Sequence, residues 1–165
     1  MWQAYYDKDK VRLFALLVTT LREQYRYPWA KSTVAAFYLA RAATEFADAH
    51  AHYERVLPDL ERAYSIAKDW SGARFNPGAV AQAELAWWVA RRTPGENNAE
   101  NVGTRIAEEY ALLYEVPSEK VLQPAILRAK AAAIRDQGGK QANWPIISQL
   151  LRESYKSLHA AVSRR

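Results

Sequence analysis

Residues 143–162 read NWPIISQLLRESYKSLHAAV, and this stretch has the clearest helical pattern in the chain. Apolar residues recur in it every three or four positions, which is the period of one helix face. They are Ile147, Leu150, Leu151, Tyr155, Leu158 and Val162. Asn143 and Pro145 suit a helix start, because asparagine can accept a hydrogen bond from the first turn and proline tolerates that turn. The stretch predicts an amphipathic helix that buries one side.

The same period continues through the rest of the C-terminal half. Residues 118–138 predict a helix that Ser118 caps and that Gly138 and Gly139 end. Its expected inward positions are Leu122, Ile126, Ala129 and Ala133. Residues 99–114 predict another helix, with Val102, Ile106, Tyr110 and Leu113 together on one side. Residues 78–92 are apolar on almost every side, which predicts a central helix.

The N-terminal half follows the same pattern. A helix is predicted over residues 7–25, and it stops before Pro28. Ser32 is the expected N-cap of a long helix that runs to Val56, and Pro58 should break or kink it before a shorter helix over residues 59–70. No segment alternates as a strand does. We therefore expect an all-α protein, with residues 1–165 forming one domain, a bundle of six or seven helices.

Composition narrows the class of protein. Half of the residues are hydrophobic and a quarter are charged, which is typical of a globular domain rather than a disordered one. Cysteine is absent, which excludes disulfides, thiolate metal sites and a cysteine nucleophile. The N-terminus lacks the pattern of a signal peptide, and its longest apolar run, residues 13–18, is too short to cross a bilayer. We expect a cytoplasmic protein.

Asp48, His50, His52 and Glu54 are the densest group of possible metal ligands. On a helix, Asp48 and His52 share one face while His50 and Glu54 share a nearly opposite one. They would not converge on one ion, and a polar surface is the simpler interpretation. We expect no metal and no cofactor.

Two carboxylates fall on apolar helix faces and are candidates for acid–base chemistry. Glu84 lies among Val80, Trp87, Trp88 and Arg91, so burial would favour its protonated form, as a general acid requires. The alternative is an internal ion pair, with Arg91 as the partner, that fixes the helix register. Glu109, beside Ile106 and Tyr110, has the same two interpretations.

Arg152 and His159 are separated by six residues and share one side of the last predicted helix, with Tyr155 near them. This spacing resembles the arginine-and-histidine motif of helical ribonucleases of the HEPN type, in which the pair from two protomers cleaves RNA. No glycine-rich phosphate loop and no serine nucleophile motif accompanies it. The resemblance implies a ribonuclease as an alternative to a non-catalytic protein.

The chain also contains six tryptophans and ten tyrosines. These side chains could line a ligand pocket or stack on bases. Trp87, Trp88, Tyr110 and Tyr155 fall on predicted core faces, so we expect most of the aromatic residues to be packing residues. A regulatory or ligand-binding helical protein remains a further alternative.

The formal net charge of +5 suits a polyanionic partner. Lysine and arginine at helical spacing could contact phosphates, although such residues also keep ordinary helix surfaces soluble. The candidate nucleic-acid-binding residues are Arg91, Arg92, Lys120, Arg128, Arg135, Arg152 and Lys156. Arg91 and Arg92 also suit a helix C-terminus regardless of function.

In length, helical class, positive charge and lack of cysteine, and in the general character of residues 83–162, the chain resembles the small helical subunit of CRISPR effector (Cascade-type) complexes. The resemblance implies a helical subunit that serves antiviral defence by helping to hold DNA strands through basic side chains, without catalysis. It also implies partners: DNA or RNA, other protein subunits, or further copies of the same chain. We therefore expect a non-enzymatic nucleic-acid-binding subunit, with no membrane partner.

Overall fold

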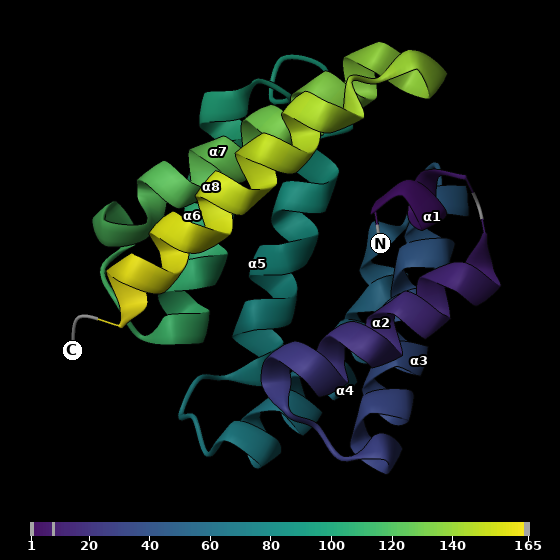
Figure 1. Ribbon diagram of the computed structural model, residues 1–165, viewed down its shortest axis with the longest axis vertical. Coiled ribbons are helices and arrows are strands. Elements are labelled where there is room, and N and C mark those ends of the chain that lie inside the picture. The colour runs from purple at the N-terminus through teal and green to yellow at the C-terminus, as the bar shows by residue number, and fades with distance from the viewer. Residues whose placement is uncertain (1, 8, 164–165) are drawn as a thin grey trace. The chain divides into compact units, whose positions relative to one another are not determined.

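The computed structural model describes residues 2–7 and 9–163 of the chain (Figure 1). Helices make up 82% of the residues described, and no strand occurs among them. The all-α prediction is therefore confirmed. In the described part of the chain there are eight α-helices, one more than the upper expectation, because a short N-terminal helix was not predicted.

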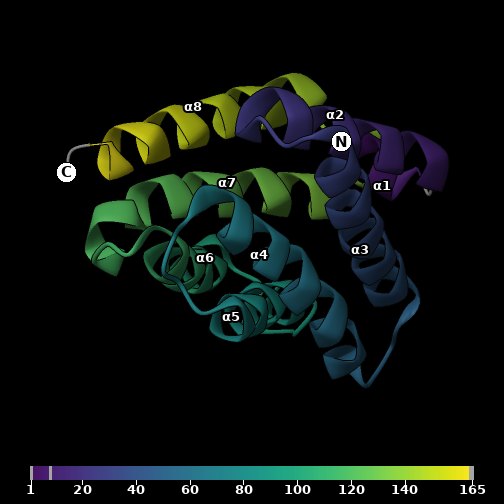
Figure 2. The same ribbon diagram turned by 90° about the horizontal axis from the view of Figure 1, so that it is seen from below.

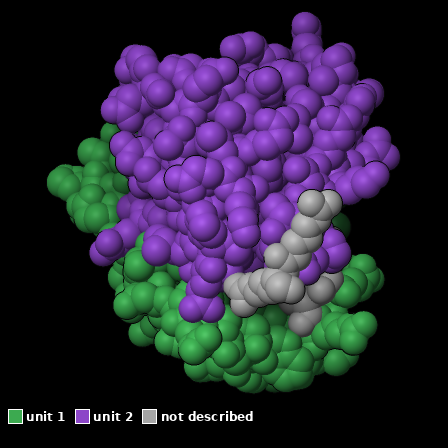
Figure 3. All heavy atoms as spheres, turned by 90° about the vertical axis from the view of Figure 1, so that its left-hand side faces the viewer, with its two compact units in different colours: residues 1–81 green, residues 82–165 purple. Residues whose placement is uncertain are grey.

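The chain divides into two compact units, residues 1–81 and residues 82–165 (Figure 3). The boundary between them falls within helix α5 (Pro77–Ala90). The expectation of a single domain over residues 1–165 stays a prediction.

Unit 1 contains the helices α1 (Trp2–Tyr6), α2 (Lys10–Tyr25), α3 (Trp29–Asp48) and α4 (Leu57–Ser71). Helix α2 packs on α3, and α3 packs on α4. One core cluster of this unit consists of Val18, Leu21, Tyr27, Ala35 and Ala36. Phe14 and Leu17 of α2 are half-buried against this cluster.

The prolines of unit 1 begin helices, and this corrects two predicted boundaries. Helix α3 begins at Trp29 after Pro28, so Ser32 is not its N-cap. Ser32 is instead buried inside the helix, where its hydroxyl donates to the Trp29 carbonyl at 2.8 Å. The helix also ends at Asp48, and Pro58 lies in the first turn of α4 rather than kinking a continuous helix. Proline suits a first turn because its fixed φ is helical and its missing N–H is not needed there.

Unit 2 contains the C-terminal part of α5 and the helices α6 (Ala99–Tyr114), α7 (Ser118–Gly138) and α8 (Trp144–Val162). Helix α7 packs on α6 and on α8, and α7 and α8 run side by side in opposite directions (Figures 1 and 2). The predicted bounds of α6 are confirmed, and the Asn98 side chain caps it by accepting from the Asn101 N–H at 2.8 Å. Asn143 caps α8 as expected, by accepting from the Ile146 N–H.

The core of unit 2 corrects the predicted register of α7. This helix buries Val121, Ala125, Ala129 and Ala132, whereas Leu122 is 37% exposed and Ala133 is half-buried. A helix with so many alanines has apolar side chains on several sides, so periodicity alone does not choose between neighbouring registers. The small side chains allow α7 to approach α6 closely, and they determine which face of α7 is buried.

Helix α6 ends at Tyr114, and the next residue, Glu115, has a left-handed backbone with a φ of 52°. This conformation is strained for residues with a Cβ atom, and glycine adopts it freely. We expect Glu115→Gly to raise the free energy of unfolding by about 1 kcal/mol in urea denaturation. Glu115→Ala removes the same charge but keeps the Cβ atom, so it should give little of this gain. Equal effects of the two variants would contradict the strain explanation.

Candidate nucleic-acid interface

The predicted basic residues differ in how far solvent reaches them. Arg92, Lys120, Arg152 and Lys156 are exposed. Arg92 follows the end of α5, Lys120 lies in the first turn of α7, and Arg152 and Lys156 lie one turn apart on α8. These positions allow contact with a ligand in solution. The remaining three residues, Arg91, Arg128 and Arg135, are partly or wholly used inside unit 2.

Arg91 connects two helices of unit 2. Its guanidinium forms an ion pair with Asp136 of α7 at 2.9 Å, and it also lies 5.8 Å from the centre of the Trp87 ring. Arg91 was the expected partner of Glu84, which is 9% exposed on α5. The ion pair with Asp136 holds the C-terminal end of α5 against α7, which is a structural use of this arginine.

Arg128 extends into the interior of unit 2. Its Nη1 donates to the Tyr110 hydroxyl at 3.0 Å, and its guanidinium lies 4.9 Å from the centre of the Trp87 ring. Its Nε is buried and makes no hydrogen bond within the described part of the chain. Burial opposes the charge of Arg128, but Tyr110, Tyr155 and Glu109 together raise its pKa well above the ordinary value. The side chain is therefore a partly buried cation whose Nε is shielded from solvent.

Glu109 completes this interior arrangement. It is 4% exposed, and its carboxylate accepts a hydrogen bond from the Trp87 indole N–H at 2.7 Å. Burial also raises the pKa of Tyr110, against the opposing effect of Arg128, so the phenol stays protonated at neutral pH. We call Trp87, Glu109, Tyr110 and Arg128 the buried cluster. It joins α5, α6 and α7 through polar contacts inside an apolar core.

Arg135 is also partly buried. Its Nε has no exposed surface, and its guanidinium lies 6.0 Å from the centre of the Trp144 ring. The expected basic row on α7, formed by Lys120, Arg128 and Arg135, is therefore not one exposed row. Of these three residues, only Lys120 is exposed.

The exposed side of α8 has a different character. Arg152, Lys156 and His159 are exposed, and Tyr155 is 49% exposed. Residues at these intervals of three, four and seven positions lie on one side of a helix. We call these four residues the α8 stripe. The prediction that Tyr155 belongs to the core is wrong, and Ser154, which donates to the Pro124 carbonyl at 2.7 Å, is the buried neighbour instead.

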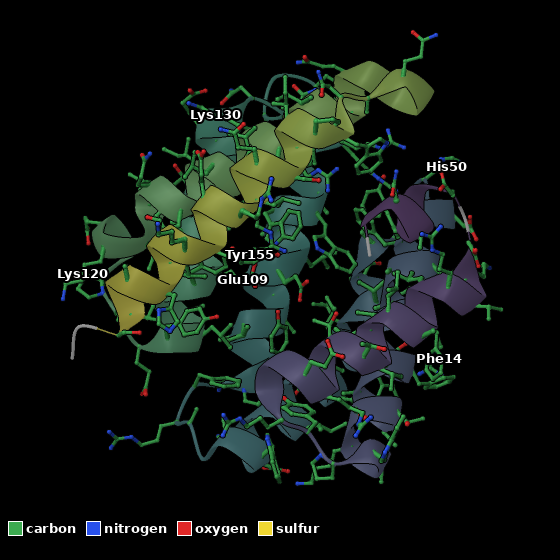
Figure 4. The ribbon with its side chains drawn as sticks, in the orientation of Figure 1. Phe14, His50, Glu109, Lys120, Lys130 and Tyr155 are labelled. Atoms are coloured by element: carbon green, nitrogen blue, oxygen red, sulfur yellow. The ribbon has the colours of Figure 1, made fainter. Side chains whose placement is uncertain are left out.

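The positive charge of unit 2 is concentrated on α7 and α8. Helix α8 contains one acidic residue, Glu153, which accepts a hydrogen bond from the Gln149 amide at 2.9 Å. Helix α7 contributes exposed lysines at positions 120 and 130, and Figure 4 shows both projecting from it. Helix α6 has the opposite balance, with Glu100, Glu108 and Glu109 against Arg105. Glu119 and Asp136 offset part of the charge of α7, so the basic side chains that a polyanion could meet lie mainly on α8 and at Lys120 and Lys130.

Other candidate sites gain little from the structure. Asp48, His50, His52 and Glu54 lie at the end of α3 and in the segment that follows, and His52 contacts Glu54 at 3.2 Å on the exposed surface. No group of three or more possible metal ligands occurs among the described residues.

Among the described residues there is a shallow surface depression and no helix that could span a membrane. A shallow depression of about 300 Å³ on α3 of unit 1 is lined by Phe37, Ala40, Arg41, Thr44 and Glu45. Of the helices described, none has both the length and the apolar composition that crossing a membrane requires. Neither observation identifies a ligand.

Sequence reasoning missed the buried cluster as a unit. The sequence does place Glu109 and Arg128 on two consecutive predicted helices. Whether these two residues come close together depends on how α6 packs on α7, which the sequence pattern does not determine. Comparison with protein-family models, with curated proteins and with solved structures found no match.

Proposed function

We propose that this chain is a non-catalytic helical subunit that contacts the backbone of nucleic acid through the exposed cations of α7 and α8. The α8 stripe is the observation that carries the proposal. Arg152 and Lys156 are exposed, lie on one side of the helix and are about 6 Å apart along its axis. Side chains placed in this way on a rigid element can contact successive phosphates.

The distribution of charge supports this location over the others. Arg91, Arg128 and Arg135 are engaged within unit 2, so the proposed contact surface keeps Arg152 and Lys156, with Lys120 adding to the potential. The resemblance to the small helical subunit of CRISPR effector complexes supplies the finer proposal. In that case the chain works inside a larger assembly, with other protein subunits or further copies of itself as partners.

Reversing both charges on the α8 stripe tests the proposal. We expect the variant Arg152→Glu with Lys156→Glu to bind oligonucleotides about tenfold more weakly, because each lost cation removes the release of counterions from one phosphate. Fluorescence anisotropy with a labelled oligonucleotide measures this change. Both residues are exposed, so thermal unfolding should be almost unaffected.

The matched control is Arg74→Glu with Arg105→Glu, which makes the same change in net charge at exposed positions outside α7 and α8. Its affinity should stay close to that of the wild type. Equal losses in the two variants would reject the α8 stripe as the contact surface. Shortening of an RNA oligonucleotide by the wild type, but not by His159→Ala, would instead favour the ribonuclease alternative, because His159 is exposed on the same side of α8 as Arg152.

A further inference from the structure

We propose that the α8 stripe binds single-stranded nucleic acid, with one base stacked on the ring of Tyr155. This inference rests on the proposed function and specifies its ligand. It starts from an unusual position for an aromatic residue: Tyr155 belongs to the sequence pattern of the buried face, yet it is 49% exposed. An exposed aromatic ring between cations is the arrangement by which proteins combine base stacking with backbone contact.

Two neighbours of Tyr155 provide the cations. Arg152 precedes it by three residues and Lys156 follows it directly, while the imidazole of His159 lies four residues further on. All three side chains are exposed, so Arg152 and Lys156 can reach phosphates beside a base that lies on the ring. Glu153 is the acidic residue of α8, and it is hydrogen-bonded to Gln149. The ring and the cations together form a continuous surface along one side of the helix.

Tyr155 lies near the buried cluster, because its phenol contributes to the raised pKa of both Arg128 and Tyr110. Figure 4 shows Tyr155 on α8 and Glu109 on α6 in the middle of unit 2. The ring therefore projects from a helix that packs on α7, and a rigid helix limits the freedom that the side chain loses when a base stacks on it.

A single strand fits this surface better than a duplex does. The faces of paired bases are covered by their neighbours in a double helix, whereas an unpaired base offers its face to an aromatic side chain. Stacking does not depend on the sugar, so the shared chemistry is that of an unpaired base next to phosphates. Both single-stranded DNA and single-stranded RNA satisfy it.

Anisotropy titrations with oligo-dT, oligo-rU and a duplex of the same length test the inference. We expect both single strands to bind more tightly than the duplex, and a preference between them would identify the natural strand. We expect Tyr155→Ala to weaken single-strand binding about tenfold and Tyr155→Phe to stay within about threefold of the wild type, since phenylalanine keeps the ring face. Phe37→Ala is the matched control, because Phe37 is also 49% exposed but lies on α3 of unit 1.

Photocrosslinking to an oligonucleotide that contains 5-iodouracil gives a second readout, which does not depend on affinity. We expect the crosslinked peptide to contain Tyr155. Equal binding of duplex and single strand, or equal affinities of Tyr155→Ala and the wild type, would overturn the stacking inference while leaving backbone contact intact. Loss of all salt-dependent binding would instead reject the proposed function itself.

Discussion

Replacing Arg128 with methionine should lower the free energy of unfolding of unit 2 by about 3–5 kcal/mol. The substitution removes the cation from the buried cluster, and with it the favourable interaction between Arg128 and the carboxylate of Glu109, which is 4% exposed. The Tyr110 hydroxyl also loses the hydrogen bond that Arg128 donates at 3.0 Å. Urea denaturation followed by tryptophan fluorescence measures the loss, because Trp87 belongs to the cluster.

Lys130→Met is the matched control for this experiment, since Lys130 is an exposed cation on the same helix. Its effect should be about 0.5 kcal/mol or less. Adding Glu109→Gln to Arg128→Met should recover part of the loss, because the buried negative charge then disappears as well. The pKa of Arg128 is raised in the folded protein, so its contribution is present at neutral pH and is lost only in strong alkali. Equal effects of Arg128→Met and Lys130→Met would contradict the assignment of Arg128 as a partly buried cation.

Gly103→Ala should destabilise unit 2 by about 2 kcal/mol, although alanine is the better helix former. A Cβ atom on Gly103 would lie 2.8 Å from the Ile126 Cγ1 atom and 3.0 Å from the Ile126 Cα atom. The second of these is a backbone atom, so α6 and α7 would have to separate. Thermal and urea unfolding measure the effect.

Gly78→Ala is the control for Gly103→Ala. A Cβ atom on Gly78 would meet nothing closer than 3.4 Å, so this variant should be neutral or slightly stabilising. Combining Gly103→Ala with Ile126→Ala should recover only part of the loss, because the backbone contact remains. A stabilising effect of Gly103→Ala would show that the two helices are not in close contact at this position.

Sequence patterns predicted the helices of this protein better than their buried faces. The bounds of α6 followed from local periodicity and the start of α8 from Asn143 and Pro145, which are local properties of the chain. The register of α7 did not follow, because alanines on several sides make two registers almost equivalent until α6 packs on it. The exposure of Tyr155 was also missed. Periodicity assigned the buried position on α8 to the aromatic residue, whereas the small side chain of its neighbour Ser154 is the buried one.

The candidate site was predictable to a similar degree. The spacing of Arg152 and Lys156 on one helix placed both correctly on an exposed surface. The burial of Arg128 was not predictable, because an arginine enters a core only where partners from other helices meet it, and those partners are Trp87 and Tyr110. Counting charges alone therefore overestimated the number of basic residues on α7 that a ligand can reach, because, of Lys120, Arg128 and Arg135, only Lys120 is exposed.

The salt dependence of binding tests the central claim most directly. For single strands, the slope of log affinity against log salt changes by about 0.7 for each phosphate contact. If Arg152 and Lys156 each contact a phosphate, the slope for Arg152→Glu with Lys156→Glu should be smaller in magnitude than the wild-type slope by roughly 1.4. An unchanged slope would show that these two cations do not contact the nucleic-acid backbone.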